Sequence, residues 1–120
     1  MIVLDASAAL AFLQGEPGAD RVEALLSDAA ISAANWSEIA QKVMSRGGDW
    51  QLARSLLLSY GLTVEPVTAD DSEAAAELWQ PGNGLSLGDR LCLALTARFQ
   101  TRAVTADQAW GTSDHVEQIR

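Results

Sequence analysis

The sequence has one cysteine, one histidine and one lysine, and each scarcity excludes a class of protein. Cys92 cannot form an internal disulfide, and because small secreted domains often depend on several, we expect a reducing compartment, the cytoplasm. The lone His115 and the lack of a Gly-x-Ser-x-Gly sequence exclude a Ser-His-Asp nucleophile. Glycine-rich phosphate loops of the Walker or dinucleotide-binding type are also missing.

Long apolar runs are missing as well. The most apolar stretches, residues 55–60 and 91–97, fall far short of the ~20 residues that a membrane-spanning helix needs. No charged leader precedes an apolar, signal-like segment. We therefore expect a soluble protein with no membrane partner.

Basic side chains are few, because 8 Lys and Arg stand against 16 Asp and Glu, giving a net charge of −8. This balance argues against a protein that grips nucleic acid with a basic surface alone. It does not exclude an enzyme whose acidic cluster binds a divalent cation, since each bound ion places two positive charges where a phosphate must sit. With 120 residues, 48% of them hydrophobic, residues 1–120 are expected to form one domain.

Short apolar runs alternate with helical patterns along the whole chain. This alternation predicts an α/β fold: a doubly wound, Rossmann-like, mostly parallel sheet of about four or five strands with helices on both faces. In such folds, sites lie at the edge where the carboxyl ends of the strands meet. The predicted strands cover residues 2–4, 29–32, 62–67, 103–105 and 115–119, and the predicted helices cover residues 6–13, 20–28, 34–46, 49–60, 70–79 and 90–99.

Four acidic residues occupy positions that this fold would bring together. Asp5 and Asp107 each directly follow a predicted strand, so both should face the same crevice. Glu38 lies in the first turns of one predicted helix, and Asp89 lies near the start of another. Carboxylate oxygens from separate elements are typical Mg²⁺ ligands, and without a cation four such groups would repel one another. The pattern predicts a Mg²⁺ site that activates water against a phosphate.

Each of these acids also has a structural explanation. Asp5 and Asp89 suit helix N-caps. Asp107 suits a turn, and Glu38 taken alone is usually a solvated helix residue. Capping, however, gives no reason for two strand-end aspartates to accompany the other two acids.

The residues around the four acids carry a resemblance to a known family. The segments are VLDASA at 3–8, NWSE at 35–38, LSLGDRL at 85–91 and VTADQAW at 104–110. In this order they resemble the PIN-domain ribonucleases, and most of all the VapC-type toxins of bacterial toxin–antitoxin pairs. The likeness covers nearly the whole chain.

The resemblance implies a PIN-like sheet, one or two Mg²⁺ or Mn²⁺ ions, and hydrolysis of RNA by an endoribonuclease that inhibits growth or translation. It also implies a homodimer and a cognate antitoxin that blocks the groove. Ser7 and Thr105 match small polar positions that orient a ligand or water, and Asp114 offers a further carboxylate. The positions that match the metal-binding and catalytic acids are Asp5, Glu38, Asp89 and Asp107. Candidate basic contacts to RNA, which the sequence does not place on one face, are Lys42, Arg46, Arg54, Arg90, Arg98 and Arg102.

Other functions suit an aspartate-rich, doubly wound sheet. A receiver-like signalling domain needs an acidic pair at the first strand and a lysine after the last one, whereas Lys42 lies inside a predicted helix. A phosphoaspartyl hydrolase needs Asp-x-Asp where this chain has Asp5-Ala6-Ser7. A third alternative is a PIN-like module that binds RNA or protein without cutting, and only an activity assay distinguishes it from the nuclease.

Overall fold

The computed structural model describes residues 1–120 and contains a five-stranded sheet whose neighbouring strands are all parallel. The strands are β1 (Ile2–Leu4), β2 (Ala29–Ser32), β3 (Thr63–Glu65), β4 (Ala103–Thr105) and β5 (Val116–Gln118). Their order is β3-β2-β1-β4-β5, so the chain moves outward from β1 to β3 and then returns to the other side of β1. Binding sites in such sheets lie at the carboxyl ends of the strands that flank this reversal, here β1 and β4.

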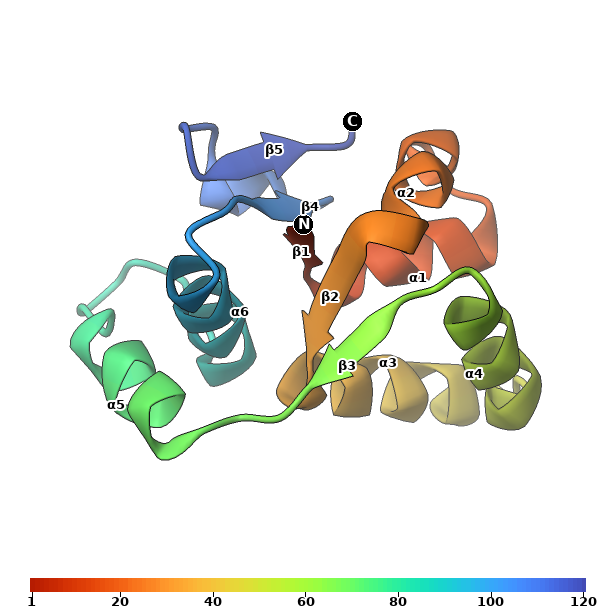
Figure 1. Cartoon of the computed structure of the whole chain (residues 1–120), viewed down its shortest axis with the longest axis horizontal. Helices are drawn as coiled ribbons and strands as arrows, with labels where there is room; N and C mark the ends of the chain where they lie inside the picture. The colour runs from red at the N-terminus through yellow and green to blue at the C-terminus, as the bar shows by residue number, and fades with distance from the viewer.

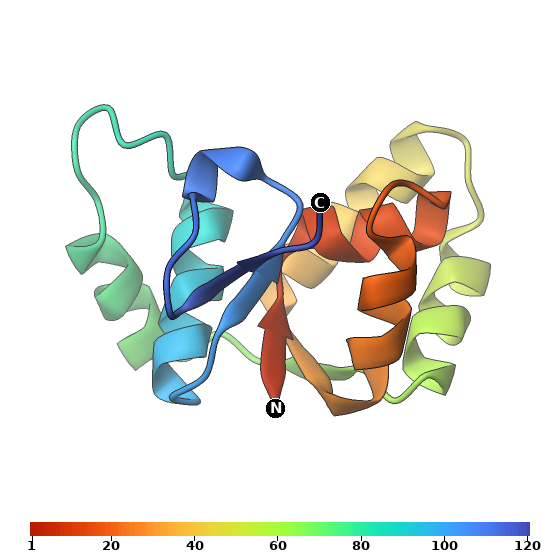
Figure 2. The ribbon, with the colours of Figure 1, turned by 90° about the horizontal axis from the view of Figure 1, so that it is seen from above.

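Helices cover both faces of the sheet. Figure 1 shows α1, α2 and α4 on one side of the strands and α5 and α6 on the other, and Figure 2 shows the same two groups from above. The helices are α1 (Ala6–Gln14), α2 (Ala19–Leu25), α3 (Ala33–Ser45), α4 (Trp50–Ser59), α5 (Ala69–Glu77) and α6 (Leu87–Arg98), with 3₁₀ turns η1 (Leu26–Asp28) and η2 (Gln108–Trp110). The predicted fold class, a doubly wound parallel sheet with helices on both faces, is confirmed.

Several element boundaries differ from those predicted, and two of the differences change how a helix begins or ends. Helix α6 begins at Leu87, earlier than the predicted start at residue 90, because Ser86 caps it. The Ser86 hydroxyl accepts the N–H of Asp89 at 3.1 Å, and the Asp89 carboxylate accepts the N–H of Ser86 at 2.9 Å. This capping box outweighs the low helix propensity of Gly88. Residues 26–28 form the 3₁₀ turn η1 instead of continuing the second helix.

The core fixes β1 from both faces, as expected for the central strand of a parallel sheet. Leu4 packs with Ile31 of β2 and Ile39 of α3 in the main hydrophobic cluster. Val3 packs on the opposite face with Cys92 of α6. None of the helices has the length and apolar content that crossing a bilayer requires.

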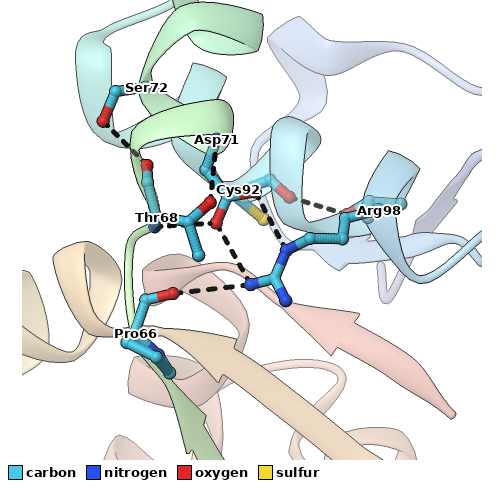
Figure 3. Close-up of polar contacts among 7 residues, drawn as sticks. Pro66, Thr68, Asp71, Ser72, Cys92 and Arg98 are labelled. Carbon is cyan, nitrogen blue, oxygen red and sulfur yellow. Dashed lines mark hydrogen bonds and ion pairs between the residues drawn. The ribbon is translucent and has the colours of Figure 1, made fainter.

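Helix α5 is held against α6 by an ion pair (Figure 3). The Arg98 guanidinium donates to the Asp71 carboxylate at 3.0 and 3.1 Å and to the Pro66 carbonyl at 3.4 Å. Asp71 also forms a capping box with Thr68 at the start of α5. Burial alone would raise the pKa of Asp71, but hydrogen bonds from Arg98 and from the Thr68 backbone lower it below its ordinary value. The pair therefore links the start of α5 to the end of α6.

Candidate active site

A hydrogen-bonded network of side chains joins the end of β1 to the end of β4. Asp5 follows β1, caps α1 and is 4% exposed. Its Oδ1 accepts the N–H of Ala8 at 2.9 Å and the Ser7 hydroxyl at 2.7 Å. Its Oδ2 accepts the Thr105 hydroxyl at 2.5 Å. The network places Asp5 at the strand reversal, with Ser7 and Thr105 beside it.

Backbone amides after β4 fix the direction of these two hydroxyls. Ser7 Oγ accepts the N–H of Ala106 at 2.9 Å, and Thr105 Oγ1 accepts the N–H of Asp107 at 2.9 Å. Because each hydroxyl oxygen already accepts from an amide, its own proton can point at Asp5. Ser7 and Thr105 are thus arranged to orient the Asp5 carboxylate.

Burial raises the pKa of Asp5 from 3.8 to about 6, although hydrogen bonds from Thr105, Ala8 and Ser7 act to lower it. The negative charge of Asp89 adds to the increase. Asp5 and Asp89 are therefore close enough to repel each other when both are ionised. A cation bound at this edge would favour the ionised form of both groups.

Glu38 and Asp89 reach this edge from α3 and α6, which contact each other. Asp89 lies in the first turn of α6, where its Oδ2 is used by the capping box with Ser86. Glu38 lies one turn into α3, and its Oε1 accepts the side-chain amide of Asn35 at 2.7 Å. The same amide donates to the carbonyl of Gly88 at 3.1 Å, directly before Asp89.

The buried thiol of Cys92 is affected by the charges of three of these carboxylates. Its pKa is raised well above the ordinary value, first by burial and then by the charges of Asp5, Asp89 and Glu38. Charges act on a thiol in this way only over short distances through protein. Asp5, Glu38 and Asp89 therefore all act on this thiol, and the Asn35 amide holds Glu38 against the residue before Asp89.

Asp107 lies at the same edge, but its side chain is turned toward its own loop. The backbone N–H of Asp107 is bound by Thr105, whereas its Oδ1 accepts the N–H of Ala109 at 2.9 Å and caps η2. Asp114 lies in the turn before β5, whose first residue pairs with the first residue of β4. That turn belongs to the amino-end edge of the sheet, so the structure separates Asp114 from the other four acids.

The four carboxylates have no protein cation beside them, because the ion pairs of the molecule involve Asp28, Asp71 and Glu117. As the side chains stand, no three Asp, Glu, His or Cys residues meet closely enough to hold a metal ion. Asp89 and Asp107 each use one oxygen for a local cap, and the other oxygen of each accepts no hydrogen bond from the protein. All the potential ligand atoms of these four side chains are carboxylate oxygens, and no protein cation balances their negative charge. A hard divalent cation binds ligands of this kind.

Half of the basic residues considered for RNA binding are held by the protein itself. Arg98 binds Asp71, Arg102 binds Glu117, and Arg90 donates to a backbone carbonyl of α5 at 2.9 Å. The remaining candidates, which are exposed and form no ion pair, are Lys42, Arg46 and Arg54. The candidates that bind neither an acid nor a backbone carbonyl are thus confined to α3, its C-cap and α4.

Two residues of this site have contacts that sequence analysis did not foresee. Asn35 and Gly88 both lie inside the segments that carry the family resemblance, yet neither was given a role. The spacing of Asn35 and Glu38, three apart on a helix, is the one local signal for a contact between them. Nothing local indicates that Gly88 lies against Glu38.

Comparisons with known proteins give sequence matches over most of the chain. The family model for the PIN domain matches residues 2–113, a range that includes all four acids. A VapC ribonuclease of Mycobacterium bovis and ribonuclease VapC42 of Mycobacterium tuberculosis are each 33% identical to the chain over 113 residues. These matches cover 88% of this chain and 86% of each relative.

Solved structures with a similar fold include toxins. A toxin–antitoxin complex from Klebsiella pneumoniae matches with a TM-score of 0.82 at 20% identity, covering 100% of this chain and 98% of the other. VapC20 of Mycobacterium tuberculosis, described as a toxin that cleaves the sarcin–ricin loop, matches with a TM-score of 0.73 at 23% identity, covering 95% and 98%. VapBC2 from Rickettsia felis, bound to a DNA fragment of its promoter, gives 0.69 at 20% identity, covering 98% of both chains. At these identities the likeness shows the fold.

Proposed function

Because this chain belongs to the PIN-domain family and is of the VapC type, we propose that it is a metal-dependent endoribonuclease that hydrolyses phosphodiester bonds in RNA. One observation carries the proposal. Asp5 lies at the strand reversal, the Asn35 amide holds Glu38 against the residue before Asp89, and no protein cation forms an ion pair with these acids. Mutual repulsion opposes folding, whereas a divalent cation needs these oxygens. The names of the two mycobacterial relatives support the same activity.

The proposed ion is Mg²⁺, for which Mn²⁺ can substitute. When bound, such an ion lowers the pKa of a water molecule and neutralises charge on the phosphate. The protein's own contribution is to orient oxygens, and Ser7 and Thr105 do this for Asp5 through hydroxyl groups whose directions are fixed by backbone amides. The proposed direct ligands are Asp5, Asp89 and Asp107, while Glu38 either joins them or orients the attacking water.

The test is cleavage of a mixed tRNA, rRNA and mRNA pool by purified protein free of antitoxin, with Mg²⁺, with Mn²⁺ and with chelator. Asp89→Asn is expected to reduce cleavage by roughly 100-fold or more, because it removes a ligand charge. Asp114→Asn is the matched control, since it removes the same charge at the opposite edge of the sheet. Cutting that persists in chelator, or that Asp89→Asn leaves intact, contradicts the assignment.

We also propose that the chain is the toxin of a toxin–antitoxin pair, acting in the cytoplasm as a homodimer and blocked by a cognate antitoxin. The similarity to a toxin–antitoxin complex of Klebsiella pneumoniae and to VapBC2 of Rickettsia felis supports this role. Expression in a bacterial host is expected to stop growth, and co-expression of the antitoxin is expected to restore it. Asp89→Asn at equal expression separates catalytic arrest from the burden of expression. Normal growth with a protein that cleaves RNA in vitro contradicts the toxin role.

The alternative is a PIN-like module that binds RNA or protein without cutting. It is favoured by the observation that no three acidic side chains meet as they stand. A folded protein that binds RNA but cuts no substrate with either ion would establish this alternative.

A further inference from the structure

We propose that Asn35 and Gly88 are positioning residues that set where the Glu38 carboxylate lies relative to Asp89, an inference that rests on the proposed nuclease function. Asn35 is 1% exposed, and its amide nitrogen lies between two oxygens from different helices. These are Glu38 Oε1 at 2.7 Å and the Gly88 carbonyl at 3.1 Å. Since a side-chain amide has two N–H groups, both contacts are satisfied at once. One side chain thus ties Glu38 of α3 to the backbone of α6.

The orientation of this amide leaves another buried atom without a partner. Asn35 Oδ1 is buried and makes no hydrogen bond. Turning the amide over would place that oxygen against the two acceptors, Glu38 Oε1 and the Gly88 carbonyl. An unpaired buried acceptor is unfavourable and uncommon, so stability alone does not explain an asparagine at this position. The bridge between Glu38 and α6 is the feature that the asparagine supplies.

Gly88 serves the same contact by making room for it. A Cβ at this position would lie 2.6 Å from Oε1 and 2.9 Å from Cδ of Glu38, so the carboxylate would have to move. Gly88 lies in the first turn of α6 and does not have a left-handed φ, so its backbone conformation does not require glycine. Alanine has a higher helix propensity than glycine, so the absence of a side chain here serves Glu38 and not the backbone.

Two variants test the inference by different routes. Asn35→Ala removes the bridge, and Gly88→Ala displaces the flexible end of the Glu38 side chain while favouring α6. Each is expected to weaken Mn²⁺ binding, measured by titration calorimetry, by about tenfold or more. Each is also expected to lower kcat for RNA cleavage with little change in KM. Ser37→Ala is the matched control, because Ser37 is exposed on the same helix and should leave both measurements unchanged.

Thermal unfolding separates positioning from stability. Gly88→Ala is expected to melt at the wild-type temperature or higher, so a loss of Mn²⁺ affinity in this variant does not come from unfolding. If Asn35→Ala proves too unstable to purify, the Mn²⁺ affinity of Gly88→Ala alone tests the positioning role. Because both residues act through Glu38, the double variant should bind Mn²⁺ about as weakly as the worse single variant.

The outcomes are distinguishable. Wild-type affinity and kcat in both single variants, or effects that multiply in the double variant, overturn the positioning role while leaving the nuclease proposal intact. A wild-type protein that neither binds Mn²⁺ nor cleaves RNA overturns the proposed function, and the positioning role with it. A wild-type protein that binds Mn²⁺ but does not cleave overturns only the nuclease, and the Mn²⁺ affinities of the variants still decide the role of Asn35 and Gly88.

Discussion

Asp5→Asn is expected to abolish RNA cleavage and, in the absence of divalent ions, to make the protein more stable. The Asp5 carboxylate is 4% exposed and close to Asp89, and burial raises its pKa to about 6. A protonated Asp5 side chain has one hydroxyl donor and one carbonyl acceptor. Asparagine has nearly the same shape, with an NH₂ donor and a carbonyl acceptor at the same positions. The variant should therefore behave like the protonated wild type at every pH.

The magnitude follows from the pKa of Asp5 in the two states. A rise from 3.8 to about 6 corresponds to about 3 kcal/mol, at ~1.4 kcal/mol for each pKa unit. The folded state binds this proton more tightly than the unfolded state, so the contribution to stability is complete below pH 3.8 and is lost as the pH rises through 6. Above this window the variant should exceed the wild type by up to ~3 kcal/mol, or roughly 10 °C in Tm for a chain of this size.

The assay is urea denaturation of both proteins in chelator across that range of pH, followed by circular dichroism. The difference in the free energy of unfolding should be near zero at the acid end and reach a plateau at neutral pH. A variant less stable than the wild type at neutral pH, or a difference that does not vary with pH, would refute the argument that the buried charge of Asp5 opposes folding. Retained cleavage by the variant would refute its role as a ligand.

Two other predictions concern the helices behind the site. Arg98→Met leaves Asp71 without its cation and should lower the free energy of unfolding by about 1–2 kcal/mol at neutral pH, measured by urea denaturation. Because the pKa of Asp71 is lowered in the folded state, this loss should shrink as the pH falls below about 4; a loss that persists in acid would assign the effect to packing. Cys92 is buried with a raised pKa, so iodoacetamide should modify it only after unfolding, as followed by mass spectrometry. Rapid alkylation of the native protein would contradict this burial.

The fold was predictable because its signals are local. The three central strands are short apolar runs buried on both faces, and the sequence shows each of them between helical patterns. Asp49 was expected to start the fourth helix, and its carboxylate does cap α4. Since all strands are parallel, the position of Asp5 directly after β1 and of Asp107 two residues after the end of β4 was enough to place both at one edge.

The details of the site were less predictable because they depend on contacts between distant residues. The amide of Asn35 meets the carbonyl of Gly88 across 53 positions of the chain, a pairing that no local pattern specifies. Conversely, Asp114 is close to Asp107 in sequence, but the turn before β5 carries it to the other edge. Asp89 suited an N-cap from its position alone, whereas Ser86 takes that role and Asp89 closes the box.

Three of the four acids stand at the beginnings of helical segments: Asp5 caps α1, Asp89 completes the capping box of α6, and Asp107 caps η2. Asparagine is about as good a cap as aspartate. If the proposed site is correct, Asp→Asn at Asp5 or Asp107 is therefore expected to remove activity while the cap, and with it the fold, is kept. Such an inactive variant would still present the rest of its surface intact, so it would compete with the active protein for whatever partner binds that surface.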